Sequence, residues 1–351
     1  MKKIFYVAIA FAFTACGTSK DASKEEEDTN VDQAAKYAET ITAKDLGTHL
    51  FIYASDEFEG RETGEPGQKK AVEYLKNFYV SEGIVSPLGG DDYFQEVPAE
   101  WINKNTRRGT FKDSENVVAF IKGTEKPDEI VVISAHLDHE GIKDGKIYNG
   151  ADDDGSGTVA ILEIAQAFKM ASKAGKGPKR SILFLHVTGE EKGLLGSKYY
   201  TDVDPLFPLA NTVCDLNIDM VGRIDDRHKN DPNFVYLIGS DKLSTELHNI
   251  SEAVNKKYTN INLDYKYNDE NDPNRFYYRS DHYNFAKNNV PIIFYFNGTH
   301  ADYHKPTDTP DKINYELLEN RTRLVFHTAW EVANMEKRIV ADKATKKEEA
   351  K

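Results

Sequence analysis

The sequence predicts an α/β fold, a three-layer sandwich with helices flanking a mostly parallel, mixed central β-sheet. Short, nearly uninterrupted apolar runs alternate with longer segments of helical periodicity, which is the pattern of such a fold. The hydrophobic fraction of 39%, with 11% aromatic residues in 351, is sufficient for a large core. No stretch of linker composition interrupts the alternation, so we expect one domain over residues 42–338.

The ends of the chain have different compositions from this domain. Two lysines precede an apolar stretch over residues 4–13, a pattern typical of a signal peptide and too short to span a bilayer. Residues 13–16 resemble a bacterial lipobox. We therefore expect residues 1–15 to be cleaved and Cys16 to carry a lipid, anchoring an exported chain to a cell-envelope membrane that faces the periplasm or exterior. An ordinary signal peptide with an incidental cysteine is the alternative. The polar, charged composition of residues 16–41 predicts a disordered acidic tether, and that of residues 339–351 predicts a charged tail.

The charge and the cysteines exclude several classes of function. The chain has 45 basic and 58 acidic residues and a formal charge of −13, which argues against a nucleic-acid surface. Lipidation of Cys16 would leave Cys214 as the one free thiol, so an intrachain disulfide is not expected. Because Cys214 lies in an apolar, strand-like run, it is interpreted as a core residue rather than a nucleophile.

Local signals place the helices in order. Thr42 is a capping residue for a helix that extends to about residue 54, and Pro66 and Gly83 mark the start and end of the next. Helical periodicity recurs four times between the later apolar runs and once more near the C-terminus. These helices are predicted over residues 156–171, 193–200, 242–258, 280–288 and 315–338.

The strands are of two kinds. Polar and apolar residues mix in two short segments, 93–97 and 106–112, which predicts partly exposed strands. The other runs are almost wholly apolar and are interpreted as buried parallel strands. They cover residues 117–121, 130–135, 181–187, 213–218, 234–238 and 291–296.

Acidic residues and histidines follow the carboxyl ends of these runs, where ligands bind in open α/β sheets. So many neighbouring carboxylates repel one another unless a cation balances them. Imidazole and carboxylate ligands without thiolates suit Zn²⁺, with Mn²⁺ or Co²⁺ as alternatives. The residues are His136, Asp138 and His139, Asp152–Asp154 at a helix start, Glu190 and Glu191, Asp219, and His300 and His304.

Each feature also has a simpler interpretation. His136 alone could be a core histidine, but a carboxylate two residues later, at Asp138, can orient a metal-bound imidazole. The run of aspartates could cap a helix. Glu190 and Glu191 could form an exposed loop, or one could bind metal while the other acts as a general base. Ser156 as a nucleophile with His304 as its base is a further alternative.

Together the motifs resemble the co-catalytic di-zinc aminopeptidases, a family that includes aminopeptidase Y, bacterial leucyl aminopeptidase and the catalytic domain of glutamate carboxypeptidase II. The motifs are HLDH (136–139), GADDDGSG (150–157), TGEE (188–191), NIDMVGR (217–223), RSDH (279–282) and DYHKPTDTPDKI (302–313). Upstream, residues 55–75 also fit bacterial members.

The resemblance implies a role for each matching residue. His136 and Asp219 would hold one zinc ion, and Glu191 and His304 the other. Asp153 would bridge the two ions, with a cis peptide bond to Asp154. Glu190 would be the general base, Asp138 would support His136, and Tyr303 would help to polarise the substrate carbonyl.

Two histidines stand out within this resemblance. His139 occupies a position where many relatives carry a small polar residue, so it would add a ligand or narrow the pocket. His300 lies four residues before His304 and is a competing ligand, although the motif favours His304.

The function implied is a zinc-dependent aminopeptidase that removes N-terminal residues from peptides as a monomer, without a nucleic-acid partner. Two other functions stay open. One is a mono-zinc acyltransferase like glutaminyl cyclase, and the other is a non-catalytic binding ectodomain of the same fold.

Overall fold

The computed structural model describes Met1 and residues 32–344. The predicted signal peptide beyond Met1, the lipid site at Cys16 and the tether as far as residue 31 lie outside the described residues, as does the tail from residue 345. No helix in the described part of the chain is both long and apolar enough to cross a membrane.

The folded region starts earlier than the sequence predicts. Residues Gln33–Ala38 form helix α1, and Tyr37, Ala38 and Ile41 are buried in the main core. The tether therefore does not extend to residue 41, because these three side chains pack into the core. Their apolar pattern is difficult to recognise in the sequence because the segment is short and rich in charged and polar residues. At the other end, Ile339 is also buried, Asp342 accepts hydrogen bonds from Thr245 and the Lys343 amide donates to Leu243, so the predicted tail does not begin at residue 339.

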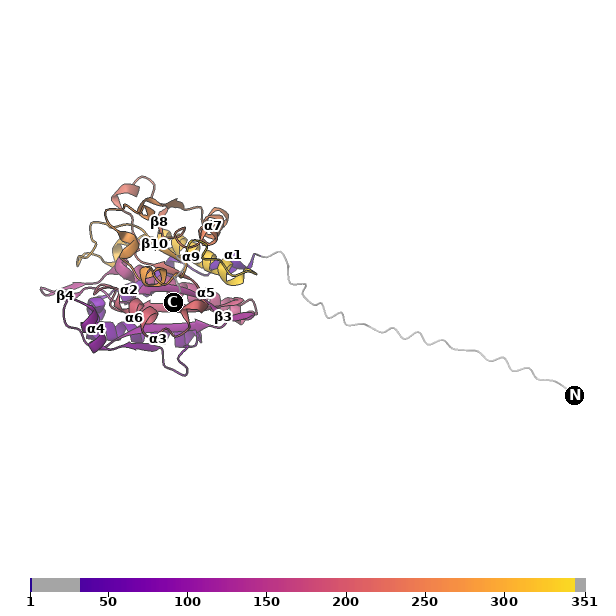
Figure 1. Ribbon diagram of the computed structural model, residues 1–351, viewed down its shortest axis with the longest axis horizontal. Coiled ribbons are helices and arrows are strands. Elements are labelled where there is room, and N and C mark those ends of the chain that lie inside the picture. The colour runs from indigo at the N-terminus through magenta and orange to yellow at the C-terminus, as the bar shows by residue number, and fades with distance from the viewer. Residues whose placement is uncertain (2–31, 345–351) are drawn as a thin grey trace, which may run out of the picture. The chain divides into compact units, whose positions relative to one another are not determined.

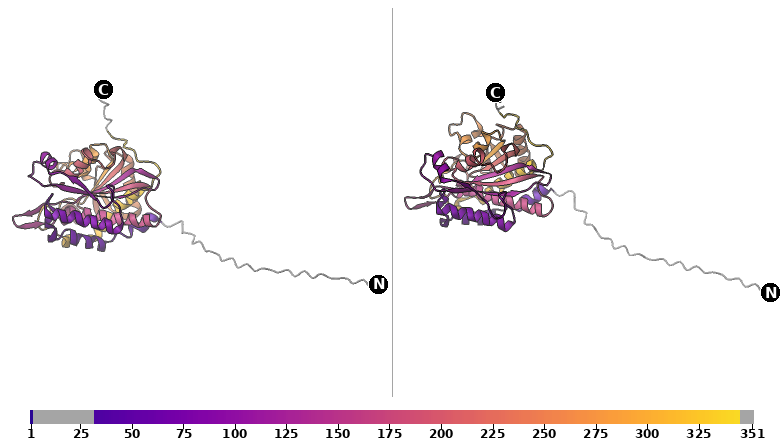
Figure 2. Two further views of the ribbon diagram at one scale, coloured as in Figure 1. Left: turned by 90° about the horizontal axis from the view of Figure 1, so that it is seen from below. Right: turned by 60° about the horizontal axis from the view of Figure 1, so that its bottom comes forward.

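The predicted α/β class is confirmed, with a mixed sheet at the centre (Figures 1 and 2). Within the described residues the sheet has eight strands in the order β1-β2-β6-β3-β7-β10-β8-β9, and a separate hairpin pairs β4 with β5. The strands are β1 (Phe94–Val97), β2 (Ser114–Ile121), β3 (Lys126–His136), β4 (Gly141–Lys143), β5 (Lys146–Tyr148), β6 (Arg180–Val187), β7 (Thr212–Ile218), β8 (Phe234–Ile238), β9 (Asn262–Asp264) and β10 (Ile292–Phe296).

The four central strands β6, β3, β7 and β10 run parallel, so their carboxyl ends lie at one edge of the sheet. The interpretation of 117–121 and 234–238 as parallel strands is wrong, because β2 is antiparallel to β6 and β8 is antiparallel to β10. Both strands are buried on their two faces. That burial gives them the continuous apolar pattern of a parallel strand without deciding their direction.

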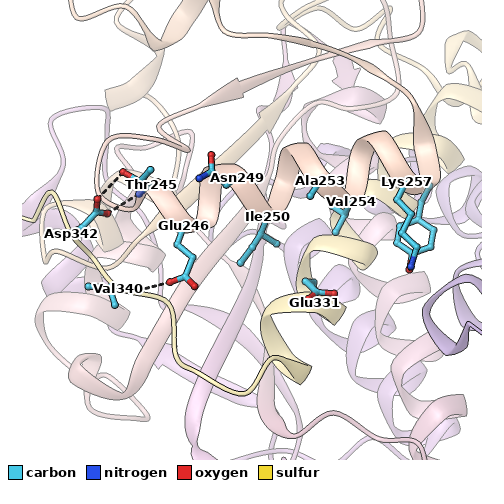
Figure 3. A pocket seen from close by; sticks show the side chains of 11 residues that line it. Thr245, Glu246, Asn249, Ile250, Ala253, Val254, Lys257, Glu331, Val340 and Asp342 are labelled. Atoms are coloured by element: carbon cyan, nitrogen blue, oxygen red, sulfur yellow. Dashed lines mark hydrogen bonds between the residues drawn. The ribbon is translucent and has the colours of Figure 1, made fainter.

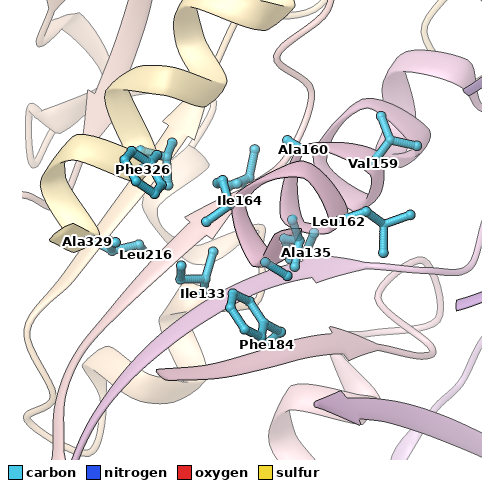
Figure 4. Packing of buried hydrophobic residues seen from close by; sticks show 14 of the residues in the cluster. Ile133, Ala135, Val159, Ala160, Leu162, Ile164, Phe184, Leu216, Phe326 and Ala329 are labelled. Atoms are coloured by element: carbon cyan, nitrogen blue, oxygen red, sulfur yellow. The ribbon is translucent and has the colours of Figure 1, made fainter. Parts of the chain in front are cut away.

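Helices lie against both faces of the sheet. On one face α1, α2, α3, α5, α7 and α9 enclose the larger core, where Ile133 and Leu216 of the sheet meet Ile164 and Phe326 (Figure 4). On the other face α6 and α8 cover a second core. The helices are α1, α2 (Ala43–Tyr53), α3 (Pro66–Glu82), α4 (Ala99–Asn105), α5 (Gly157–Lys173), α6 (Leu195–Asp202), α7 (Thr245–Val254), α8 (His282–Ala286) and α9 (Tyr315–Asn334).

The capping signals at α2 and α3 are confirmed. The Thr42 side chain accepts a hydrogen bond from the Asp45 amide, and Gly83 ends α3 in the left-handed conformation. The strand predicted over 106–112 is wrong. This segment pairs with no strand because side chains hold it instead: the amide of Asn103 donates to the Phe111 carbonyl, and the Thr106 hydroxyl donates to the Lys192 carbonyl.

Glu163 of α5 is a buried acid that makes stability depend on pH. Its carboxylate is 1% exposed, and neither oxygen has a hydrogen-bond partner among the described residues. Burial, reinforced by the charge of Asp45, raises the pKa of Glu163 from 4.5 to about 8. The folded protein therefore keeps a proton that the unfolded chain releases, and the free energy of unfolding falls as the pH rises from 4.5 to 8.

Glu163→Gln is expected to remove this pH dependence. At pH 8 the variant should melt higher than the wild type by on the order of 5 °C, since glutamine stays neutral in both states. At pH 4.5 the two melting temperatures should agree. Thermal unfolding followed by circular dichroism at both pH values measures the difference, and an equal shift at both would contradict the assignment.

Candidate metal centre

The predicted site residues converge at the carboxyl edge of the parallel strands. His136 is the last residue of β3, and Asp219 follows β7 directly. Glu190 and Glu191 follow β6, and Tyr303 and His304 lie in the loop after β10. Asp153 comes from the turn that leads into α5. Its peptide bond to Asp154 is cis, as the resemblance of the motifs to the di-zinc aminopeptidases implied.

The first group of possible ligands is His136, Asp153 and Asp219. The Nε2 atom of His136 lies 3.1 Å from Asp153 Oδ1 and 3.7 Å from Asp219 Oδ1. Ligands around one tetrahedral zinc ion are separated by about 3.3 Å, so these spacings fit a shared ion. The Ser280 hydroxyl donates to Asp219 Oδ2 at 2.6 Å and so orients the carboxylate.

The second group lies on the other oxygen of Asp153. His304 Nε2 is 3.0 Å from Asp153 Oδ2 and 3.3 Å from Glu191 Oε1. Burial lowers the pKa of His304, but its contacts with these two carboxylates outweigh burial and raise the pKa to about 10. Burial and Glu191 raise the pKa of Asp153, yet His136 and His304 hold it below the usual range.

The donor atoms in this cluster fit a bound cation. His136 Nε2, Asp153 Oδ2 and Glu191 Oε1 are buried, and none has a hydrogen-bond partner within the described part of the chain. Buried polar atoms are normally paired, so three unpaired donor atoms in neighbouring ligand groups suit binding of a cation. Imidazole nitrogens and carboxylate oxygens are ligands that zinc prefers.

Asp138 supports the site differently from what its spacing predicted. His136 Nδ1 lies 3.0 Å from the backbone carbonyl of Asp138, whereas the nearer carboxylate oxygen is 3.9 Å away. The carboxylate is occupied elsewhere, because it accepts hydrogen bonds from the Thr63 hydroxyl at 2.8 Å and the Glu190 amide at 3.1 Å. Asp138 thus positions both the imidazole and the predicted general base.

Glu190 faces the pocket that opens beside these groups. Burial raises the pKa of Glu190 well above the glutamate range; His136 lowers it in part, and the charge of Glu191 raises it further. Tyr303 lines the same pocket, with its hydroxyl 3.4 Å from a guanidinium nitrogen of Arg279. The remaining walls are apolar and come from Met220, Phe276, Phe294 and Phe296.

Two buried side chains that sequence reasoning did not assign hold the surrounding loops. Arg61 is fully buried and donates to the carbonyls of Tyr53, Leu137, Asn149 and Gly150. It therefore ties the loop after β3 to the turn before α5. Asp308 accepts from the amides of Asp152 and Asp153. Their motifs, EGRETG and PTDTP, are the sequence signals that could have identified them.

His300 does not belong to the cluster. Its Nε2 atom lies 3.1 Å from Asp152 Oδ2, and Asp152 in turn accepts from the Gly222 amide. This pair braces the loops behind the site. The geometry thus agrees with the preference for His304 over His300.

A larger cavity of about 590 Å³ lies elsewhere, between α7, α9 and residues 340–342 (Figure 3). Its wall includes Ile250 and Val254, and hydrogen bonds from Thr245 to Asp342 close one end. No histidine or cysteine lines this cavity, and it contains none of the predicted site residues. The chemistry therefore belongs to the smaller pocket at the strand ends.

Known structures that share the fold include an aminopeptidase and a glutaminyl cyclase. BSAP, a zinc aminopeptidase from Bacillus subtilis, aligns with a TM-score of 0.62 and 16% identity, covering 86% of this chain and 98% of that one. Porphyromonas gingivalis glutaminyl cyclase aligns with a TM-score of 0.63 and 17% identity, covering 82% of this chain and 98% of that one. At these identities the likeness establishes the fold.

Sequence comparison adds the family. Leupeptin-inactivating enzyme 1 of Streptomyces exfoliatus is 27% identical over 258 residues, which cover 74% of this chain and 49% of that protein. The chain spans about half the length, or less, of the first curated relatives that it matches. The model of peptidase family M28 matches residues 116–329, from β2 to α9, and so includes every predicted metal ligand. The chain therefore belongs to peptidase family M28.

Proposed function

We propose that this protein is a zinc-dependent aminopeptidase whose centre holds two zinc ions bridged by Asp153. The observation that carries the proposal is the position of Asp153 between two histidines. Its Oδ1 atom lies 3.1 Å from His136 Nε2, and its Oδ2 atom lies 3.0 Å from His304 Nε2. A carboxylate whose two oxygens face separate ligand groups is suited to link two cations.

Bound zinc would polarise the scissile carbonyl and make a bound water more acidic. Within this site Glu190 accepts the proton of the attacking water and passes it to the leaving amine. The hydrogen bond from the Glu190 backbone to Asp138 holds that base beside the metal ligands. Tyr303 stands at the pocket wall, where its hydroxyl can donate to the substrate carbonyl.

The residues that line the pocket are suited to bind the N-terminal residue of a peptide substrate. The carboxylates of Asp153, Glu190 and Asp219 line it, which favours the α-ammonium group of a peptide. The phenylalanine side chains that also line the pocket provide an apolar surface for the first residue. Phe276, Phe294 and Phe296 therefore favour substrates whose N-terminal side chain is apolar.

Hydrolysis of aminoacyl p-nitroanilides tests the activity. The zinc-loaded protein should cleave leucyl or phenylalanyl p-nitroanilide, and the N-acetylated forms should react at least about 100-fold more slowly because they lack the ammonium group. A chelator should abolish cleavage and added zinc should restore it. Cleavage that is equal for free and acetylated substrates would exclude aminopeptidase specificity.

The likeness to a glutaminyl cyclase keeps an acyltransferase as the second candidate. The two candidates differ in their zinc content. The aminopeptidase would hold two zinc ions per chain, whereas the cyclase-like site would hold one. Metal analysis of the purified protein together with a glutaminyl-peptide cyclisation assay separates them. Because the two carboxylate oxygens of Asp153 lie next to different histidines, the site favours two ions and therefore the peptidase.

The proposal also includes the cellular location of the enzyme. The lysines and apolar stretch before Cys16 support export and attachment of the enzyme to a cell-envelope membrane through that cysteine. Cys16→Ser should release the protein from the membrane fraction. Unchanged membrane association of the variant would contradict lipid attachment.

A further inference from the structure

His139 is a buried histidine outside the ligand set of the proposed two-zinc centre. It lies three residues after the end of β3, and its side chain is 0% exposed. Neither Nδ1 nor Nε2 has a hydrogen-bond partner within the described residues. A buried imidazole without a partner is costly, so its position needs an explanation.

The surrounding backbone holds the ring in place. The amide of His139 donates to the Arg61 carbonyl at 3.2 Å. Gly150 packs directly on the ring, and a Cβ atom at that position would lie 2.4 Å from Cγ of His139. Gly150 also has a positive φ of 53°, which other residues adopt at a cost. The glycine thus makes room for the imidazole, because a side chain at position 150 would collide with the ring.

The Nδ1 atom of His139 faces the same two oxygens as His304. It lies 2.9 Å from Glu191 Oε1 and 3.8 Å from Asp153 Oδ2. The two imidazoles approach these oxygens from different directions, with ring centroids 5.8 Å apart and planes inclined by 70°. Glu191 Oε1 also lies 3.3 Å from His304 Nε2, so this oxygen is shared between two imidazoles rather than paired with His139 alone. The two atoms are instead placed as neighbouring ligands of one ion.

We propose that His139 Nδ1 is a fourth protein ligand of the zinc ion held by Asp153, Glu191 and His304. This inference rests on the two-zinc centre of the proposed function and adds a ligand to one of its ions. Nδ1 can bind as the neutral tautomer, with the remaining proton on Nε2.

The extra ligand makes the two ions unequal. Four protein donors would leave that ion without a free position, as in closed zinc sites, whereas the three donors His136, Asp153 and Asp219 would leave one open at the other ion. The ion beside His139 should therefore be the more tightly held. The ion beside His136 would keep the free position that water and the substrate carbonyl require.

Zinc affinity of the metal-free protein tests this assignment directly. Competition with a chromophoric chelator should resolve a tighter and a weaker ion in the wild type. In His139→Asn the tighter affinity should fall about 100-fold or more, while the weaker one changes less than about threefold. His186→Asn is the matched control, since His186 is also buried but bonds to Tyr79 outside the cluster. It should keep both affinities.

X-ray absorption at the zinc edge of the wild type gives a second readout that does not depend on a variant folding. Scattering from His136, His304 and His139 should fit three imidazoles for two ions. Two imidazoles, or unchanged affinities in a folded His139→Asn variant, would overturn the inference while leaving a peptidase with two ions intact. A wild type that binds fewer than two ions would overturn both this inference and the two-zinc proposal.

Discussion

Glu190→Gln is expected to lower kcat on aminoacyl anilides about 10³- to 10⁴-fold without loss of zinc. Glutamine keeps the size of the side chain and the backbone hydrogen bond to Asp138. It cannot accept a proton from water, so the loss is that of general-base catalysis. Steady-state kinetics and zinc content of the same sample measure the two quantities together.

Glu163→Gln is the matched control for this substitution. It makes the same chemical change at a buried glutamate of α5, away from the pocket, and should leave kcat unchanged. If Glu190→Gln kept more than about a tenth of the wild-type kcat at full zinc occupancy, Glu190 would not be the general base.

Asp153→Asn should remove more activity than any other single change in the centre. The amide is nearly isosteric with the carboxylate, but it lacks the charge and one of the two oxygens that face His136 and His304. Both ions lose a ligand, and kcat/KM is expected to fall more than about 10⁴-fold because the metal itself is lost. Zinc retained after desalting should drop by at least one ion per chain.

Asp215→Asn serves as its control. Asp215 is fully buried on β7 and accepts a hydrogen bond from Ser134, and burial raises its pKa well above the usual range. The neutral amide therefore resembles the protonated acid, so zinc content and activity should stay near the wild-type values. Full zinc occupancy in Asp153→Asn would show that this carboxylate does not bridge two ions.

Local pattern was sufficient for much of the fold. The caps at Thr42 and Gly83 and the apolar runs of the parallel strands each depend on neighbours in the sequence, so they were predicted correctly. The segment 106–112 was not, because its path depends on hydrogen bonds with the Asn103 side chain of α4 and with backbone carbonyls of the loop after β6.

The chemistry of the centre could likewise be inferred from the chain alone. Parallel strands bring their carboxyl ends to one edge, so His136, Glu191 and Asp219 had to meet once the strands were identified. Their residue types then favoured a zinc site, and the motif order indicated which family they belong to.

Only the tertiary structure showed how these residues are held. The direction of β2 and β8, the use of a carbonyl rather than a carboxylate at Asp138, and the buried guanidinium of Arg61 all depend on contacts between distant segments. The same is true of His139, whose ring faces Glu191 because Gly150 leaves room for it. The positions of the residues in the sequence determine which side chains reach the carboxyl edge of the parallel strands. Tertiary packing determines which of their atoms face the proposed metal site, because it depends on contacts between segments that are distant in the sequence.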